Sequence, residues 1–497
     1  MNKLVINHLE KIIVTSDCAT IVRELEIQHP AAKMLELAAE MQEQECGDGT
    51  NLCVSFAGEL LKNCEELLRM GLHTSEIVEG YKNAAKHMHD VLPTLVTETL
   101  SPADLRNEAE LVRVVTPVLA AKQFGYEKFL APLVAKACMQ TFSNTSKSSG
   151  VNTDSVRVAK IMGGNVSQSQ VISGMVIMRG SEGAVQHAND AKITVFACGI
   201  EASATEAKGT VLMKNADDLM NYNKSEEQKM DEIIKSVADS GTKVVISGGT
   251  VSEMAMHFIE RYGMMCIKIP SKWELKRICS AVGATALVRL GPGTAEEMGY
   301  CDEVDVKEIG GRKVVVFSQT ANAKDGCRVA TIMLRASTES VLNDLERAID
   351  DGVNSLRTLC GDSRLVPGAG ATEMALSQKI KAYGDTCPGL DQYAIRAFAT
   401  ALQFVPRTLA RNSGQEPTDV IAALGAAHHN GGGDVGVDIY GDDNDDSDGT
   451  CKAGAEILDL LHTKESALRL AIDAAVTVLR VDQIIMSKPA QAGKMGV

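Results

Sequence analysis

The sequence predicts a multi-domain protein of mixed α and β structure, in which helical segments from both chain ends enclose a strand-rich middle. Three observations carry this prediction. The chain has 497 residues, more than one ordinary hydrophobic core accommodates. Apolar residues recur at helical spacing over residues 30–145 and again after Leu334. Between these regions, short apolar runs alternate with helical patterns, as they do in α/β domains.

The N-terminal region begins with a strand and continues as helices. Ile12–Val14 is typical of a strand that ends at a polar turn, and Ala19–Leu25 predicts the next helix. Asp17 lies at the turn between them, where an acid often caps a helix. Pro30 can open a second helix at its first turn. Further helices are expected over 52–70, 75–92, 101–114 and 127–141.

The middle region has the pattern of an inserted α/β domain. Polar and charged stretches separate its apolar runs, which are short enough to be strands. One stretch, around 214–240, is a charged amphipathic helix that follows a polar segment. The expected strands are 156–161, 171–178, 192–196, 209–213, 243–246, 265–269, 286–288 and 313–318, with helices at 214–240, 251–262, 271–281 and 294–298.

The C-terminal region returns to helical spacing. A glycine-rich stretch, Gly368–Gly370, leads into one of these helices. The chain then ends in a strand-like run over 481–486. Helices are expected over 337–354, 373–382, 389–413, 417–429 and 463–480.

Composition excludes several classes of protein. A net charge of −15 disfavours binding to nucleic acid through bulk charge. No run of 18 apolar residues occurs, so we expect no membrane span, and Met1–Ile13 does not have the pattern of a signal peptide. The 13 cysteines are odd in number and contain no C-x-x-C pair, which argues against a disulfide framework or a zinc ribbon. Reduced thiols in a cytosolic protein are expected instead.

The loop Gly47–Asn51 is the strongest local candidate for a ligand site. It lies between two predicted helices and contains two glycines, which allow a backbone to approach a ligand closely. Thr50 or Asn51 would cap the second helix, whose N-terminus offers free N–H groups to an anion. Asp48 is the kind of ligand that a phosphate-bound Mg²⁺ takes. Taken alone, the loop also fits an ordinary turn between two helices.

The presence or absence of other motifs limits the kinds of reaction that this sequence could catalyse. The sequence lacks a Walker A motif and the motif set of protein kinases, which argues against a free-standing small-molecule kinase. The acidic loop 442–448 fails the calcium-loop pattern and is interpreted as a solvated loop. Two further acids, Asp17 and Asp351, lie next to turns or helix ends and remain candidates for a catalytic role. Together with Asp48 they could hold Mg²⁺ and orient a water for phosphoryl transfer, if the fold brings them together.

Four motifs in combination resemble a subunit of a group II chaperonin, the TCP-1/TRiC family. They are Gly-Asp-Gly-Thr-Asn at 47–51, Glu-Arg-Ala-Ile-Asp-Asp at 346–351, Val-Pro-Gly-Ala-Gly-Ala at 366–371, and Val-Leu-Arg-Val-Asp at 478–482. The likeness covers essentially the whole chain. It implies a helical equatorial ATPase domain built from both chain ends, a small intermediate hinge domain, and an inserted α/β apical domain with a helical protrusion. The implied segments are 1–108 and 371–497 (equatorial), 109–182 and 336–370 (intermediate), and 183–335 (apical).

The resemblance also implies roles for individual residues. Asp48 would bind Mg²⁺, and Asp17 and Asp351 would act on the attacking water, so that these three acids are the implied catalytic residues. Lys122, which alone would be interpreted as a surface lysine, matches a lysine that senses nucleotide. The implied nucleotide-binding residues are Gly47, Gly49, Thr50, Asn51, Leu52, Ala120, Ala121, Lys122, Gly368, Ala369, Gly370 and Asp459.

The function implied by the resemblance is ATP-dependent folding of non-native proteins in the cytoplasm. The chain would be one subunit of a double ring, with ATP and Mg²⁺ as cofactors and with clients that in the family include actin and tubulin. The family also has a Gly-Pro-x-Gly phosphate loop before the position of Met1, which this sequence does not contain. That difference leads us to expect a missing first strand and reduced hydrolysis. The alternative is a structural ring subunit, or truncated paralogue, that hydrolyses ATP weakly.

Overall fold

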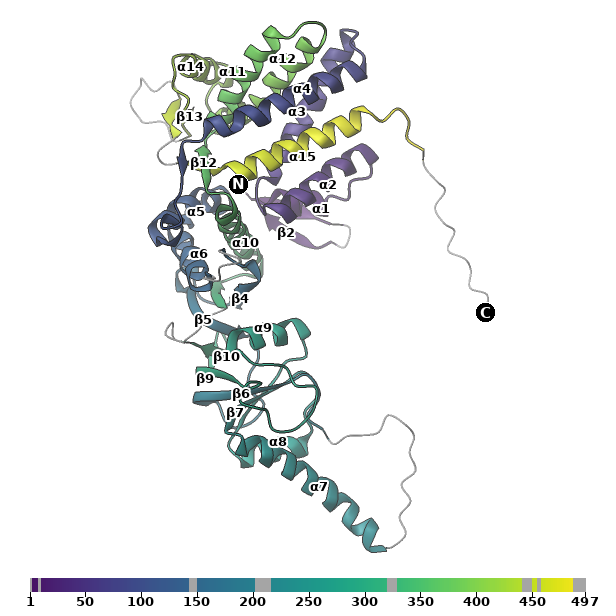
Figure 1. Ribbon diagram of the computed structural model, residues 1–497, viewed down its shortest axis with the longest axis vertical. Coiled ribbons are helices and arrows are strands. Elements are labelled where there is room, and N and C mark those ends of the chain that lie inside the picture. Colours follow the sequence, from purple (N-terminus) through teal and green to yellow (C-terminus); the bar gives the residue numbers. More distant parts are fainter. Residues whose placement is uncertain are drawn as a thin grey trace, which may run out of the picture. The chain divides into compact units, whose positions relative to one another are not determined.

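The protein is described by a computed structural model that covers residues 2–7, 10–142, 150–201, 216–319, 329–439, 449–453 and 457–485, with the backbone alone over 216–226. The chain forms two compact units (Figure 1). The first unit combines Met1–Glu127 with Asp350–Val497, and the second is Lys128–Ile349. The prediction that both chain ends enclose an inserted middle is therefore confirmed. The finer division into equatorial, intermediate and apical segments stays a prediction.

The first unit is built on a bundle of helices that share one apolar core. Three aromatic side chains lie at its centre: Phe398 makes edge contacts with Phe56 and Tyr81, at ring-centroid distances of 5.5 and 6.0 Å. All three are completely buried. The core also takes in residues from both ends of the chain. Its helices are α2 (Pro30–Glu45), α3 (Thr50–Arg69), α4 (Thr74–Val91), α11 (Ala371–Thr386), α12 (Asp391–Leu402) and α15 (Leu461–Leu479).

Shorter elements complete the first unit. The helices are α1 (Cys18–Glu24), α5 (Glu108–Lys122), α13 (Phe404–Asn412) and α14 (Pro417–His429). Two hairpins pair β1 (Lys3–Ile6) with β2 (Ile12–Thr15) and β13 (Val435–Val437) with β14 (Thr450–Lys452). A three-stranded sheet joins distant parts of the chain, because its strands are β15 (Leu458–Leu460), β12 (Arg364–Pro367) and β3 (Glu98–Thr99).

The second unit is organised around an eight-stranded mixed sheet. Its strand order is β4-β11-β5-β10-β9-β6-β7-β8, with parallel pairing between β4 and β11 and among β6, β7 and β8. Figure 1 shows α8 and α9 beside the sheet and α7 extending away from it. The strands are β4 (Val156–Met162), β5 (Gln170–Ile177), β6 (His187–Phe196), β7 (Thr242–Ser247), β8 (Met265–Lys268), β9 (Gly299–Ile309), β10 (Arg312–Ser318) and β11 (Ala330–Ala336), and the helices are α6 (Glu127–Thr141), α7 (Ala216–Asp239), α8 (Glu253–Arg261) and α9 (Lys272–Val282).

One helix belongs to both units. The helix α10 (Glu339–Gly361) is continuous across the boundary between Ile349 and Asp350. Residues from Asp350 onward therefore pack with the first unit, and this is how Asp351 reaches the candidate site described below.

Several local predictions are wrong or fall outside the described residues. The predicted helix at 294–298 is a turn, and 481–485 forms no strand. The helix predicted at 101–114 instead begins at Glu108 and ends at Lys122. Neither β9 nor β11 was predicted. The predicted strand at 209–213 and the acidic loop 442–448 lie outside the described residues.

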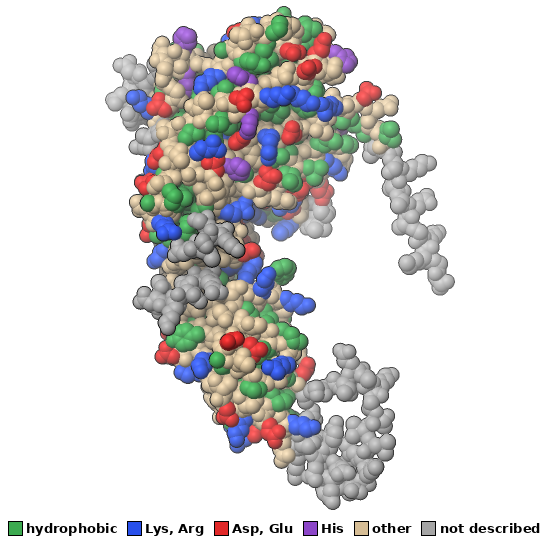
Figure 2. Space-filling view, viewed as in Figure 1, with side chains coloured by type: hydrophobic (Ala, Val, Ile, Leu, Met, Phe, Trp, Pro, Cys, Tyr) green, Lys and Arg blue, Asp and Glu red, His purple; other side chains and the backbone are tan. Residues whose placement is uncertain are grey.

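The surface mixes side chains of all types. Figure 2 shows acidic and basic residues interspersed over the face in view. Among the helices that the structure describes, none has the length and apolar character needed to cross a membrane.

Candidate functional site

The glycine loop forms the N-terminus of α3. Gly47 and Gly49 have φ angles of +76° and +80°, in the left-handed region that favours glycine. Gly49 itself is the N-cap, and no side chain caps the helix. The expectation that Thr50 or Asn51 would cap it is wrong: Thr50 is already the first helical residue. The N–H groups of the first turn therefore lack a side-chain acceptor, which leaves them available to an anion.

Neighbouring helices hold this loop in place. The Gln42 side chain, fully buried, donates from Nε2 to the carbonyl oxygen of Asp48 at 2.8 Å. Ser466 Oγ of α15 donates to Gln42 Oε1 at 2.8 Å, which fixes the Gln42 amide. Arg357 of α10 donates from Nη2 to the carbonyl oxygen of Glu45 at 2.7 Å. The loop backbone is thus rigid, whereas the half-buried carboxylate of Asp48 makes no hydrogen bond or ion pair within the described residues.

A second glycine loop leads from β12 into α11. Ala369 and Gly370 have φ angles of +53° and +80°, and Gly370 is the N-cap of α11 without a side-chain cap. The Gly368 N–H donates to the carbonyl oxygen of Ile457 at 2.8 Å. A Cβ atom on Gly368 would lie 3.2 Å from Asp459 Oδ2, so the absence of a side chain lets the loop pass close to this acid.

A buried lysine joins the first turns of α11 and α15. Lys464 Nζ lies 2.7 Å from Glu373 Oε1 and 3.0 Å from Asp459 Oδ2. The side chains of Lys464 and Glu373 are only 8% and 2% exposed. Burial alone would lower the pKa of Lys464, but the charges of Glu373 and Asp459 outweigh it and hold the pKa above its usual value. Lys464 therefore stays charged and offsets two carboxylates at this place.

These contacts connect three helix N-termini. A Cβ atom on Gly49, at the start of α3, would lie 3.1 Å from Thr463 Cγ2 in the first turn of α15. Lys464, in the same turn, is paired with Glu373 in the first turn of α11. None of the three helices has a side-chain cap. The positive ends of α3 and α15 therefore meet beside Asp48, and Lys464 ties the start of α11 to the start of α15, an arrangement suited to a polyanion with a bound cation.

Asp17, Lys122 and Asp351 form a second cluster in the same unit. Lys122 Nζ lies 3.3 Å from Asp17 Oδ1 and also donates to Asp351 Oδ2. Asp17 caps α1 by accepting from the Thr20 N–H at 3.0 Å and from Thr20 Oγ1 at 2.7 Å. Burial alone would raise the pKa of Asp17, but the charge of Lys122 and the hydrogen bonds from Thr20 lower it. Asp17 is therefore ionised at neutral pH.

The two clusters are linked through α10. Asn354, one turn after Asp351, packs directly on Gly47: a Cβ atom on Gly47 would lie 2.6 Å from Asn354 Nδ2. Residues three apart share a helix face, so Asp351 lies on the side of α10 that faces the loop. The three acids predicted from the sequence thus belong to connected parts of one unit.

The remaining predicted residues lie near the two loops or at the end of α5. Asn51 is exposed and accepts a hydrogen bond from Ser55 Oγ at 3.2 Å, and Leu52 packs on the core of the unit. Ala120 and Ala121 lie in the last turn of α5, directly before Lys122. Sequence reasoning missed Gln42, Asn354, Glu373, Lys464 and Ser466, whose spacing relative to the glycine loops carries no signal.

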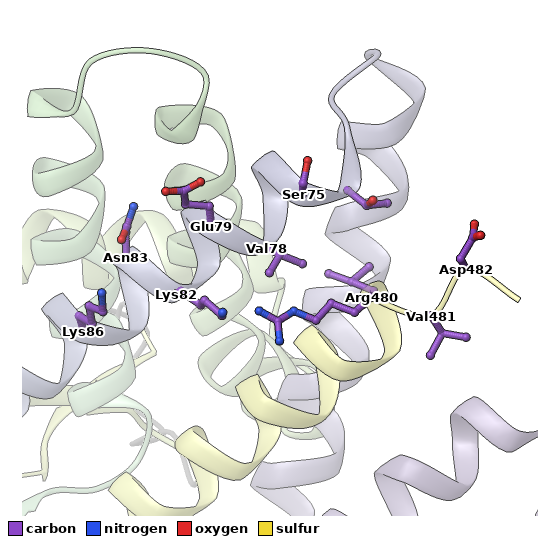
Figure 3. Close-up of a pocket in the computed structure, with 11 residues that line it drawn as sticks. Ser75, Val78, Glu79, Lys82, Asn83, Lys86, Arg480, Val481 and Asp482 are labelled. Carbon is purple, nitrogen blue, oxygen red and sulfur yellow. The ribbon is translucent and has the colours of Figure 1, made fainter.

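The candidate site does not coincide with the cleft between α4 and the end of α15. That cleft has a volume of about 570 Å³ (Figure 3). Its lining includes Lys82, Lys86, Arg480 and Asp482, and none of the residues predicted from the sequence. The clusters above therefore define the site, and the cleft is a separate feature of the first unit.

Replacing Gly47 by alanine is expected to destabilise the first unit more than replacing Gly71. Both glycines have positive φ, but a Cβ on Gly47 overlaps Asn354 whereas one on Gly71 meets no atom within 4 Å. The left-handed backbone costs about 1–2 kcal/mol in either variant, and the overlap adds about 1–3 kcal/mol in Gly47→Ala alone. Hydrogen exchange of the α3 amides measures both. Equal protection in the two variants would contradict the packing of Asn354 on the loop.

Known proteins are similar to this chain over nearly its whole length. Residues 1–489 match the TCP-1/cpn60 chaperonin family. The "T-complex protein 1 subunit theta" of Homo sapiens is 50% identical over 494 residues, covering 99% of this chain and 88% of the relative. The proteins of the same name from Arabidopsis thaliana and Dictyostelium discoideum are 49% and 46% identical, each over 99% of this chain and over 87% and 90% of their own lengths. This chain therefore belongs to the TCP-1/cpn60 chaperonin family.

Proposed function

We propose that the first unit binds Mg-ATP at the N-termini of α3, α15 and α11 and hydrolyses it with Asp48, Asp17 and Asp351. The chain acts in ATP-dependent protein folding as a subunit of a hetero-oligomeric chaperonin ring, as its family membership and its identity to theta subunits show. The observation that carries the site proposal is that the uncapped N-termini of α3 and α15 meet beside the carboxylate of Asp48, which has no partner among the described residues, while Lys464 ties the uncapped start of α11 to α15.

The residues present fit a magnesium-bound triphosphate. Asp48 offers a hard oxygen ligand with no competing hydrogen bond within the described residues, and Mg²⁺ prefers one or two carboxylates together with phosphate oxygens. Gly47, Gly49, Thr50, Asn51 and Leu52 would line the phosphates through their backbone. The ion would neutralise charge on the phosphates. Gly368, Ala369, Gly370 and Asp459 would bound the nucleotide on the other side, and Ala120 and Ala121 would bound it next to Lys122.

Asp17 and Asp351 are the candidates for positioning the attacking water. Both are buried, and Asp17 is ionised at neutral pH, so it can accept a proton or orient a water by hydrogen bonding. Lys122 holds both carboxylates in the described arrangement. We propose that phosphate competes for Lys122, so that nucleotide binding releases the two acids toward the water. Lys122 thereby senses nucleotide.

Hydrolysis would be transmitted along α10. This helix carries Asp351 in the first unit and continues without a break into the second. We propose the segments 1–108 and 371–497 as the equatorial domain, 109–182 and 336–370 as the intermediate domain, and 183–335 as the apical domain. In this scheme α7 belongs to the protrusion that closes over a non-native client, with actin and tubulin as the proposed clients.

Replacing Asp48 by alanine is expected to abolish the ATP turnover of this subunit, because the ion loses its protein ligand. The measurement uses assembled rings in which the other subunits already carry the equivalent change, so that the remaining hydrolysis comes from this chain. Asp90→Ala, an exposed acid in the same unit, is the matched control. Equal turnover in the Asp48→Ala and unaltered rings would contradict the assignment of Asp48 to the hydrolytic site. Absence of turnover in the unaltered rings would favour the alternative, a ring subunit that assembles without hydrolysing.

The β1–β2 hairpin is the surface we propose for contact with a neighbouring subunit. Its inner face is buried, with Val5 and Ile13 only 8% and 7% exposed. On the opposite face Leu4, Ile6 and Ile12 are 62%, 61% and 59% exposed. Apolar side chains gathered on one exposed face commonly mark a contact with a partner, because burial against the partner removes them from water.

Ile6→Lys is therefore expected to prevent incorporation of this subunit into rings without unfolding it. The charged side chain would be forced into the proposed apolar contact, while it remains hydrated in the free subunit. Native mass spectrometry of reconstituted rings measures incorporation, with Lys11→Ala at the hairpin turn as the control. Normal incorporation of the Ile6→Lys subunit would exclude this face from the contact.

A further inference from the structure

Three metal-ligand side chains lie together on the sheet of the second unit, whereas the proposed nucleotide site belongs to the first unit. They are His187 on β6 and Glu303 and Asp305 on β9. The register of the antiparallel pair sets His187 opposite Asp305 and Asn189 opposite Glu303. Opposed residues and residues two apart in a strand share a face, so all four side chains project from the same side of the sheet.

The ligand atoms are close enough to share one ion. One ligand atom from each of His187, Glu303 and Asp305 lies within 4.8 Å of the others. Two ligands of a tetrahedral ion are about 3.4 Å apart, because metal–nitrogen and metal–oxygen bonds are about 2.0–2.2 Å long. Side-chain rotation alone can close the difference, since the strand backbones already hold the residues in register. Among the residues that the structure describes, no second group of three such ligands is as close.

The two carboxylates of this group carry more negative charge than the described residues neutralise. The half-buried Glu303 carboxylate makes no hydrogen bond or ion pair within the described part of the chain, although it lies next to a second carboxylate. Asp305 is shared between two partners: Lys307 Nζ lies 3.6 Å from its Oδ2, and His187 Nδ1 lies 3.5 Å from its Oδ1. Lys307 reaches only one side of Asp305. Adjacent like charges on one strand face repel, and a cation between them would relieve that repulsion.

We propose that His187, Glu303 and Asp305 bind a divalent transition-metal ion of the Zn²⁺ class. Imidazole together with carboxylates is a donor set of Zn²⁺, whereas Mg²⁺ and Ca²⁺ take oxygen ligands alone. Water or the Asn189 side chain would fill the fourth position. The ion would cross-link β6 and β9. This proposal is independent of the nucleotide site, because none of its residues belongs to the first unit.

Equilibrium dialysis of the full-length chain against ZnCl₂ tests this assignment, with the bound ions counted per chain. The unaltered chain is expected to bind one ion that His187→Ala and Glu303→Gln each bind at least about tenfold more weakly. Lys307→Met is expected to tighten binding of the same ion, because it removes a competing cation. His257→Ala, which removes another exposed histidine of the same unit, is the control.

The result that overturns the proposal is equal stoichiometry and affinity in the unaltered chain, His187→Ala and Glu303→Gln. A loss that occurs equally in His257→Ala would also overturn it, because the ion would then not depend on this group. The thermal unfolding midpoint of each variant without metal shows that it is folded. Added Zn²⁺ is expected to raise that midpoint in the unaltered chain and not in the two ligand variants.

Discussion

Replacing Lys464 by methionine is expected to destabilise the first unit by about 3–5 kcal/mol, because the change leaves buried negative charge uncompensated. Lys464 Nζ is the ion-pair partner of Glu373, whose Oε2 has no hydrogen bond from any described residue. Glu373 cannot rehydrate without opening the contact between α11 and α15. Asp459 is more exposed and can regain water, so Glu373 accounts for most of the cost. Chemical denaturation of the full-length chain, followed by hydrogen exchange in α11 and α15, measures the loss.

A second substitution separates lost charge balance from lost packing. Adding Glu373→Leu to Lys464→Met removes the orphaned carboxylate, and replacing a buried pair by apolar groups is often close to neutral. The double variant is therefore expected to be more stable than Lys464→Met alone. Lys379→Met, an exposed lysine of α11, controls for the loss of a surface charge. If Lys464→Met lowers the free energy of unfolding by less than about 1 kcal/mol, the ion pair is no stronger than an ordinary surface pair. That result would contradict the conclusion that Lys464 neutralises a buried carboxylate.

Replacing Asp351 by asparagine is expected to lower ATP turnover by about 10²–10⁴-fold while nucleotide affinity changes little. The amide keeps the size of the side chain but cannot accept a proton from water. Asp351 is buried beside Lys122 and Asp17, and Thr20 already uses one of the Asp17 oxygens, so Asp17 is expected to compensate only in part. Single-turnover hydrolysis in assembled rings separates the chemical step from binding.

The adjacent acid provides the matched control for Asp351. Asp350 precedes it on the same helix and is exposed, so Asp350→Asn is expected to leave turnover within about twofold of the unaltered ring, as surface substitutions usually do. A decrease of equal size in both variants would indicate a general effect on α10. Unchanged turnover in Asp351→Asn would show that Asp351 does not act on the attacking water. Asp17 would then be the only candidate among the two acids for that role.

The broad organisation of the chain could be predicted because it depends on patterns along the sequence. Helical periodicity identified most of the helices of the first unit, and the two glycine loops marked the starts of α3 and α11. The strand β9 was missed because its many charged residues lower strand propensity. Pairing with both β10 and β6 holds it in place, and such long-range pairing is invisible in a local window.

The contacts that shape the candidate site were less predictable. Lys464 resembles any helical lysine in the sequence, and only the fold shows that it is buried between Glu373 and Asp459. Gln42 is similarly inconspicuous, although it links Asp48 to α15. The cap of α3 was also misassigned, because threonine and asparagine are common caps while the positive φ of Gly49 depends on its packing. The spacing of the motifs therefore predicted where the two glycine loops lie. The buried side chains that surround the loops could be identified only from the fold.

The most direct test of the account is a density map of the assembled ring prepared with Mg²⁺ and a non-hydrolysable ATP analogue. We predict that density in this subunit will place the phosphates at the N-termini of α3, α11 and α15, with the ion on Asp48 and Lys122 shifted away from Asp351. Clear nucleotide density in neighbouring subunits with none at these helix ends, or nucleotide bound instead in the cleft that Lys82 and Arg480 line, would contradict it.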